Sequence, residues 1–157
     1  DCGIENQGFM FETKILHNTI KNTGVCGIGG WYSSSIKGNT FSDNIIENSP
    51  QAFLYFRTDN LQENEPPVYF SDNVFKDNMF LNQKKIGDIF LTTSSITLSP
   101  EGDVTTSDFT LGNNKFINNN LGINGSAPQF YPYSMISDGG GNICQKSSNS
   151  DYPLNCQ

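Results

Sequence analysis

A short pattern of polar and apolar residues recurs four times along the chain, at residues 18–23, 39–44, 73–78 and 114–119. Each copy centres on one apolar anchor, and the anchors are Ile20, Phe41, Phe75 and Phe116. Five positions before them stand Ile15, Ile36, Phe70 and Leu111, and five positions after them stand Val25, Ile46, Phe80 and Leu121. Because such a unit cannot bury its apolar side alone, the pattern predicts stacked copies of two short strands and a bend.

The spacing of the anchors predicts the kind of stack. The steps are 21, 34 and 41 residues, and polar insertions at residues 57–67 and roughly 92–107 account for the growth. Without these insertions each step falls in the low twenties, which is close to one turn of a parallel β-helix. Both insertions follow apolar runs, at residues 53–56 and 89–91, so we expect them to leave from one corner.

The fold class expected is therefore all-β, a parallel β-helix of about five coils over residues 1–140. Residues 141–157 are expected to form a disulfide-closed C-terminal tail or cap. Asn at the bends fits this fold, because Asn tolerates left-handed backbone and stacked amides bond one another. Disorder is the alternative for a chain in which 20 of 157 residues are Asn, but 12% aromatic residues at fixed positions argue against it. An antiparallel β-sandwich stays open.

Four cysteines, an even number, favour an oxidising compartment. Cys2 and Cys26 lie 24 residues apart, about one coil, while Cys144 and Cys156 bracket a polar tail behind the triplet of glycines at 139–141. We predict these two disulfides, one sealing each end, although other pairings are compatible with the sequence. The start of the chain, Asp-Cys-Gly without Met, is that of a chain after removal of a signal peptide, so secretion is expected.

Net charge and sequence motifs limit the classes of molecule that the chain is expected to bind. A formal charge of −7 with Arg57 as the single arginine argues against nucleic acid or an anionic membrane as partner. The sequence contains no run of 18 apolar residues, which a membrane-spanning helix would need, and it contains no cofactor motif. Asn124, Gly125 and Ser126 form an N-glycosylation sequon in a Gly-rich turn, which predicts a glycan on Asn124 in a eukaryotic source.

The anchors resemble a known repeat family. The segments 41–44, 75–78 and 116–119 fit the F-x-x-N tetrapeptide of polymorphic-outer-membrane-protein repeats, and residues 29–32 resemble their Gly-Gly-Ala-Ile element, with Trp31 in place of Ala. The same phrases are similar to repeats of the right-handed β-helix superfamily that includes pectate lyases. The resemblance covers residues of about 10 to 125. It implies a right-handed β-helix in an extracellular, often adhesive module, within a superfamily that also contains polysaccharide-cleaving enzymes.

Catalysis is the first functional hypothesis to weigh. A pectate-lyase-like site needs carboxylates that hold Ca²⁺ beside a basic residue, for which Arg57 and Asp59 are the candidates. Asp43 and Asp77 share one repeat position and are weak Ca²⁺ candidates, with Asn118 continuing their row. A surface ion pair and a solvated row are the favoured interpretations. His17, the single histidine, is expected in a surface turn opposite Gly38. Because none of these groups is a strong candidate for catalysis, we expect that the chain is not an enzyme.

Binding and assembly are the other two hypotheses. Aromatic residues beside the first inserted corner, Trp31, Tyr32 and Tyr55, could stack on sugar rings next to Arg57 and Asp59. Alternation along the strands would instead turn half of the aromatics into the core. A short β-helix presents unpaired strand edges at its ends, which must be capped or paired with another subunit. The favoured hypothesis is therefore a secreted, non-catalytic structural or adhesive protein that associates with itself, for instance as a filament protomer.

Overall fold

The computed structural model describes residues 2–30, 35–49, 52–58, 68–81, 96–100, 109–122, 127, 129–130 and 133–157. At residues 52–58, 68, 96–100, 109–111 and 129 the description covers the backbone alone. These parts of the chain contain seventeen strands and one short 3-10 turn, and no α-helix. No helix among them is long and apolar enough to cross a membrane.

The strands are short and follow one another in sets of up to four. The first set is β1 (Ile4–Asn6), β2 (Phe9–Phe11), β3 (Lys14–Leu16) and β4 (Thr19–Lys21). The second is β5 (Cys26–Gly30), β6 (Ser35–Lys37), β7 (Thr40–Ser42) and β8 (Ile45–Glu47). The third is β9 (Ala52–Thr58), β10 (Val68–Ser71), β11 (Val74–Lys76) and β12 (Met79–Leu81). Then come β13 (Ile96–Pro100), β14 (Phe109–Gly112) and β15 (Asn114–Ile117), followed by β16 (Gln129–Phe130), the 3-10 turn Tyr133–Met135 and β17 (Ile136–Asp138).

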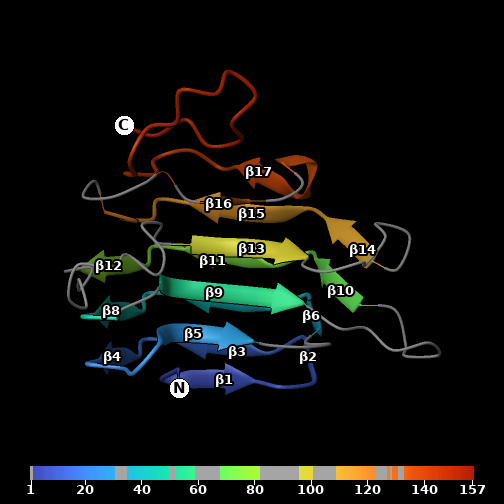
Figure 1. Cartoon of the computed structure of the whole chain (residues 1–157), viewed down its shortest axis with the longest axis vertical. Coiled ribbons are helices and arrows are strands. Elements are labelled where there is room, and N and C mark those ends of the chain that lie inside the picture. The colour runs from blue at the N-terminus through green and yellow to red at the C-terminus, as the bar shows by residue number, and fades with distance from the viewer. Residues whose placement is uncertain are drawn as a thin grey trace.

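The sets stack on one another, and their strands form four sheets in which neighbouring strands run parallel (Figure 1). Sheet A has the order β1-β5-β9-β13-β16, sheet B β2-β6-β10-β14, sheet C β3-β7-β11-β15-β17 and sheet D β4-β8-β12. Single bridges through Asn120 and Ile143 extend sheet D to the end of the stack. One passage of the chain through the four sheets is called a coil below. The prediction of an all-β fold with parallel strands is confirmed.

A five-residue unit underlies the coil. In sheets B, C and D its first three residues form the strand, and the middle one points inward. The inward row of sheet C is Ile15, Phe41, Phe75 and Phe116, and that of sheet D runs from Ile20 through Ile46 to Phe80. The rings of Phe41, Phe75 and Phe116 stack with centroids 4.8 and 4.6 Å apart, which fills the core with one continuous aromatic column.

The fourth residue of the unit turns the chain. Among the residues that the structure describes, nine other than Gly have positive φ, between 51° and 58°, namely Glu12, His17, Asn22, Asp43, Asn48, Asp72, Asp77, Asn113 and Asn118. Asn and Asp are the side chains that tolerate this left-handed backbone best, which explains why seven of the nine are of these types. The bends thus account for four of the 20 Asn residues.

The fifth residue of the unit accounts for eight more Asn residues, which form two ladders. At the corner between sheets B and C a short ladder runs Asn39, Asn73, Asn114, and between sheets C and D a long ladder runs Asn18, Asn44, Asn78, Asn119, Asn142. Inside each ladder, Nδ2 donates to the Oδ1 of the next coil and to a backbone carbonyl of the preceding one, as Asn78 does to Asn119 and to Phe41 O. Except at Asn18, the first residue of the long ladder, each described Oδ1 of the two ladders also accepts a backbone N–H. These buried amides are therefore fully hydrogen-bonded.

The predicted register of the first copy is wrong by one unit. Ile15, not Ile20, lies opposite Phe41, and Ile20 lies opposite Ile46. The true first step is therefore 26 residues, and each coil has up to four short strands, not two. Because the five-residue unit repeats within the coil, the repeated phrase fits the first coil almost as well when the alignment is shifted by five residues. His17 consequently lies in the row of Asp43, not opposite Gly38.

The predicted second insertion is also partly wrong. The strand β13 lies within residues 92–107 and pairs with β9, so that residues 96–98 lie opposite residues 54–56, a position predicted for residues 89–91. The strand β9 likewise extends to Thr58, inside the predicted first insertion. Residues 59–67, 82–95 and 101–108 lie outside the described parts of the chain, so the shared corner stays a prediction.

Candidate functional site

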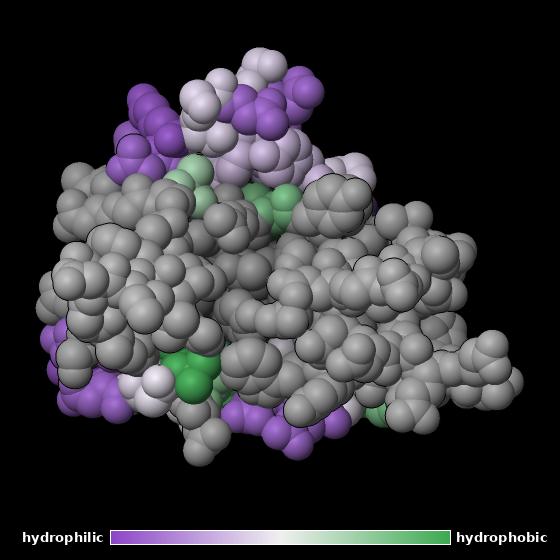
Figure 2. Space-filling model, viewed as in Figure 1, coloured by the Kyte–Doolittle hydropathy of each residue, from purple (hydrophilic) through white to green (hydrophobic). Residues whose placement is uncertain are grey.

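The two ends of the stack differ in how they are covered. At the C-terminal end, residues 139–157 fold back over the last coil, and Figure 2 shows hydrophilic colours over most of the described surface there. The backbone N–H of Gln157 donates to the carbonyl of Asn142 at 3.0 Å, and Leu154 is buried. The ring of Tyr152 packs against Phe130 with centroids 5.9 Å apart. Burial, with a smaller effect of Tyr133, raises the pKa of Tyr152 above its ordinary value.

The start of this tail passes very close to the coil below it. A Cβ atom on Gly141 would come within 2.1 Å of Oδ1 of Asn118, and φ is +72° there. A Cβ atom on Gly139 would meet Ile117 at 2.5 Å. The glycine triplet is therefore required for close approach and for the left-handed turn, which lets the tail cross the last coil.

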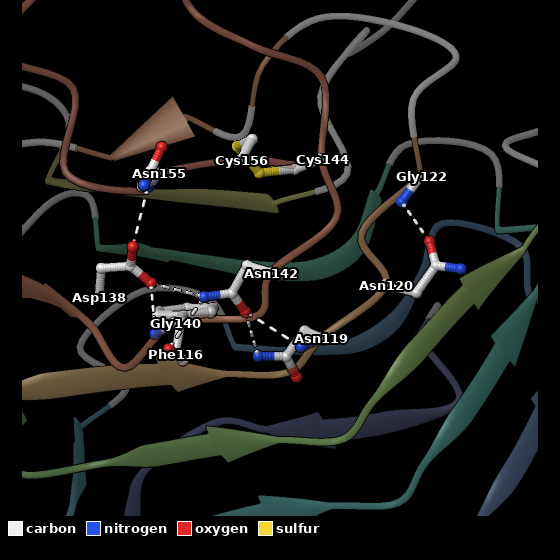
Figure 3. Close-up of a disulfide and its surroundings, with 10 residues drawn as sticks. All are labelled: Phe116, Asn119, Asn120, Gly122, Asp138, Gly140, Asn142, Cys144, Asn155 and Cys156. Carbon is white, nitrogen blue, oxygen red and sulfur yellow. Dashed lines mark hydrogen bonds between the residues drawn. A yellow bond between two sulfur atoms is a disulfide. The ribbon is translucent and has the colours of Figure 1, made fainter.

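Asp138 fastens the tail to the end of the long ladder (Figure 3). Its Oδ1 accepts the side-chain N–H of Asn142 at 2.8 Å and the backbone N–H of Gly140 at 2.9 Å. Its Oδ2 accepts the backbone N–H of Asn155 at 3.0 Å. A carboxylate has acceptors only, so it takes up the last amide donor of the ladder and leaves none for a further coil.

Both predicted cysteine pairs are joined in the structure. Cys144 and Cys156 close the tail with Cα atoms 5.1 Å apart, and Cys2 is bonded to Cys26 of the next coil with Cα atoms 4.4 Å apart. The tail also forms a solvent-open cavity of about 330 Å³, which is lined by residues that include Asp138, Lys146, Asn149 and Tyr152. Asp138 and Asn149 already have partners within the tail or the last coil. The two disulfides fit an extracellular protein.

The N-terminal end has no such cover among the described residues. The strands β1, β2, β3 and β4 each end their sheet, with a neighbour on one side only. The inward residues Ile4, Met10 and Ile20 are half-buried, whereas their partners Ile28, Ile36 and Ile46 in the second coil are 2, 0 and 0% exposed. The core is therefore partly open at this end, and the four strand edges can pair with another chain.

Aromatic side chains stand on the outside of the same coil. Phe9 and Phe11 flank the inward Met10 on β2 and are 57% and 46% exposed. Their ring centroids lie 5.6 Å apart, and Phe11 meets the edge of Tyr69 at 5.9 Å. The ammonium of Lys37 lies 5.3 Å from the centre of the Tyr69 ring, in a cation–π contact. Phe9, Phe11, Lys37 and Tyr69 are called the aromatic surface below.

Asn18 begins the long ladder at the open end. Its Nδ2 donates to Oδ1 of Asn44 and to the carbonyl of Leu16, both at 3.0 Å. Within the described parts of the chain its own Oδ1 accepts no hydrogen bond, whereas Oδ1 of Asn44 accepts two from the coil before it. At its N-terminal end the ladder thus offers the Oδ1 of Asn18 as an acceptor. At its C-terminal end both N–H groups of Asn142 already donate, to Phe116 O and to Asp138.

Asp43 and Asp77 lie in one row, as predicted, because the backbone N–H of Asp43 bonds the carbonyl of Lys76. Their carboxylates do not converge on a common centre. Asp43 accepts from the Ser42 hydroxyl and lies 3.9 Å from Nδ1 of His17, while Asp77 lies 3.4 Å from the Lys76 ammonium. In the described parts of the chain no three His, Cys, Asp or Glu side chains are grouped as metal ligands would be.

The other predicted site residues fall largely outside the description. Trp31, Tyr32, Asp59 and Asn124 are not among the described residues, so sugar stacking and glycosylation there stay predictions. For Tyr55 and Arg57 the backbone alone is described, within β9, where Arg57 lies opposite Ser99. Sequence analysis missed Phe9 and Phe11. The alternation of Phe9, Met10 and Phe11 was the available signal, since an inward Met10 turns both rings outward.

Comparison with protein-family models, with curated proteins and with solved structures finds no significant match to this chain.

Proposed function

We propose that the chain is a right-handed parallel β-helix that works outside the cell as a non-catalytic structural or adhesive module and associates through its first coil. The single observation that supports this is the difference between the ends. One end is closed by a disulfide-bonded tail, while the other offers four strand edges and two exposed Phe rings. Secretion is part of the proposal and is supported by the two disulfides.

The chemistry of the first coil suits association better than catalysis. Strand edges supply main-chain donors and acceptors for β-augmentation, and exposed aromatic rings supply apolar area for a protein contact. By contrast, Asp43 and Asp77 are paired with a hydroxyl, an imidazole or an ammonium group on the surface. A polysaccharide-cleaving activity has no described arrangement of residues in its favour.

Sedimentation velocity of the chain over a range of concentrations tests the proposal. We expect reversible association that is lost in Phe11→Glu, because the substitution replaces an exposed apolar ring with a charge that is costly to bury in the contact. Ile143→Glu is the matched control, since Ile143 is 41% exposed but lies at the closed end. A chain that stays monomeric and binds no surface up to about millimolar concentration contradicts the proposal.

Carbohydrate binding is the second candidate, and the aromatic surface is the observation that favours it. Aromatic rings such as Tyr69 and Phe11 offer faces on which sugar rings stack, with Lys37 beside them as a hydrogen-bond donor. A glycan array that gives a signal with the chain and none with Tyr69→Ala would support it. A signal unaffected by Tyr69→Ala and Phe11→Ala would exclude this surface.

A further inference from the structure

We propose that two copies of the chain join first coil to first coil around a two-fold axis and form a closed dimer. This inference rests on the proposed function and names the partner of the same surface. A filament of stacked copies needs a second surface at the opposite end of each copy. The contact proposed here uses one surface twice, and the following observations on the two ends favour it.

The C-terminal end is closed to a stacking partner. Asp138 has already accepted three N–H groups, from Gly140, Asn142 and Asn155. The tail lies over the last coil, and Leu154 and Cys156 are each 5% exposed. A second copy could reach the strand edges here only after the tail had moved. Hydrogen bonds from the N–H of Asn155 to Asp138 and from the N–H of Gln145 to the carbonyl of Gly122 hold the tail to the last coil. Head-to-tail stacking therefore lacks one of its two surfaces.

Charge favours contact between two first coils. The whole chain carries −7, so that two copies repel each other in most orientations. Residues 1–25 contain three acidic residues, Asp1, Glu5 and Glu12, and two basic ones, Lys14 and Lys21, so they hold only −1 of the net charge of −7. Lys21 is paired with Glu47 of the second coil at 2.9 Å, which leaves Lys14 as the basic group for a contact. A two-fold contact brings the acidic groups of one copy near the basic groups of the other, and the negative remainder of each copy points away. The first coil is thus a place where like chains meet with little net repulsion.

The exposed groups of this end are also self-complementary. Both N–H groups of the Asn18 amide already donate within the chain, so each Asn18 side chain can only accept, and a strand edge of the other copy supplies the N–H donor. Its free Oδ1 provides one acceptor in each copy. Strands related by this axis run antiparallel, and antiparallel edges pair as well as parallel ones. Phe9 and Phe11 extend the contact on the outside of β2 and would become buried against their symmetry mates.

Two measurements on the disulfide-bonded chain test the dimer. Sedimentation equilibrium should give twice the chain mass of 17.4 kDa and nothing larger. Zero-length amine-to-carboxylate cross-linking in a mixture of ¹⁴N and ¹⁵N copies should link Lys14 or Lys21 of one copy to Glu5 or Glu12 of the other. Cross-links between a first-coil lysine and Asp151 in the tail of another copy, or polymers beyond a dimer, overturn the two-fold contact while leaving association through the first coil intact.

A pair of charge variants separates this contact from general charge repulsion. Lys14→Glu and Lys146→Glu change the net charge of the chain equally, but Lys146 lies in the tail. We expect Lys14→Glu to weaken the dimer at least about tenfold at low salt, with partial recovery at high salt, and Lys146→Glu to leave it unchanged. Equal weakening by both variants overturns the proposed contact. Monomers under all conditions overturn both this inference and the association on which it rests.

Discussion

Asp138 accepts a side-chain hydrogen bond from Asn142 at 2.8 Å, and this bond is the last one of the long asparagine ladder. Asp138→Ala leaves three N–H donors without their acceptor, one of them on a side chain that is fully buried. We expect the free energy of unfolding to fall by about 2–3 kcal/mol, as measured by urea unfolding. Asp151→Ala, an exposed carboxylate in the tail, serves as control and should cost under about 0.5 kcal/mol.

Asparagines of the ladders and of the bends should respond differently to mutation. Asn78→Ala removes both acceptance from Asn44 and donation to Asn119 and Phe41 O, so several buried groups lose partners at once. We expect a loss of about 3–5 kcal/mol in chemical denaturation. In Asn118→Gly, at an exposed bend with φ of 51°, the change should stay within about 0.5 kcal/mol. Similar losses in both variants would contradict the described ladder.

The aromatic column should carry much of the stability of the core. Phe75 stacks between Phe41 and Phe116 and is 2% exposed, so Phe75→Ala opens a cavity on both sides. The expected cost is about 3–5 kcal/mol by thermal or urea unfolding. Phe11→Ala is the control, because the same side chain is 46% exposed on the outside of β2 and should cost under about 1 kcal/mol.

The tail should open without the coils when its disulfide is removed. Cys144→Ser with Cys156→Ser releases a segment of 12 residues, and the loop-entropy relation gives a loss of about 3 kcal/mol. Hydrogen exchange should speed up in residues 145–157 and stay slow in β7 and β11 of the central coils. Loss of protection throughout the chain would instead mean that the tail and the coils unfold together.

Alkaline pH should weaken the packing of the tail. Because the folded state raises the pKa of Tyr152, the unfolded chain releases this proton first, from about pH 10 upward. Above that pH the unfolded state binds fewer protons than the folded one, so stability decreases as pH rises. Urea unfolding at pH 8 and pH 11 should show a smaller decrease in Tyr152→Phe than in the unaltered chain. Equal decreases would exclude Tyr152 as the group responsible.

The apolar anchors of the later copies were predictable, and the register of the first copy was not. Phe41, Phe75 and Phe116 align because each is the Phe of an Asn-x-Phe-x-x-Asn phrase, which is distinctive. Ile20 fits the anchor pattern as well as Ile15 does, since both are the middle residue of the same five-residue unit. Only hydrogen bonding between coils decides that Ile15 faces Phe41.

Features that depend on the folded ends were the least accessible from sequence. The partial exposure of Met10 follows from its place in a coil with one neighbour, which no local pattern reports. The part played by Asp138 depends on where the tail turns back, 17 residues later in the chain at Asn155. The strand β13 was missed because its residues, ITLSP, resemble a loop in composition and pair through the backbone.

The asparagine ladders also give the stack an electrical direction. Every ladder amide between two others points its Oδ1 toward the N-terminal end and one N–H toward the C-terminal end, so the amide dipoles add along the axis. The C-terminal end of the long ladder is therefore its positive pole, and Asp138 places a negative charge there, as an acidic residue does at the start of an α-helix. A ladder whose amides pointed the opposite way would have its negative pole at this end, where a cation would be the stabilising charge.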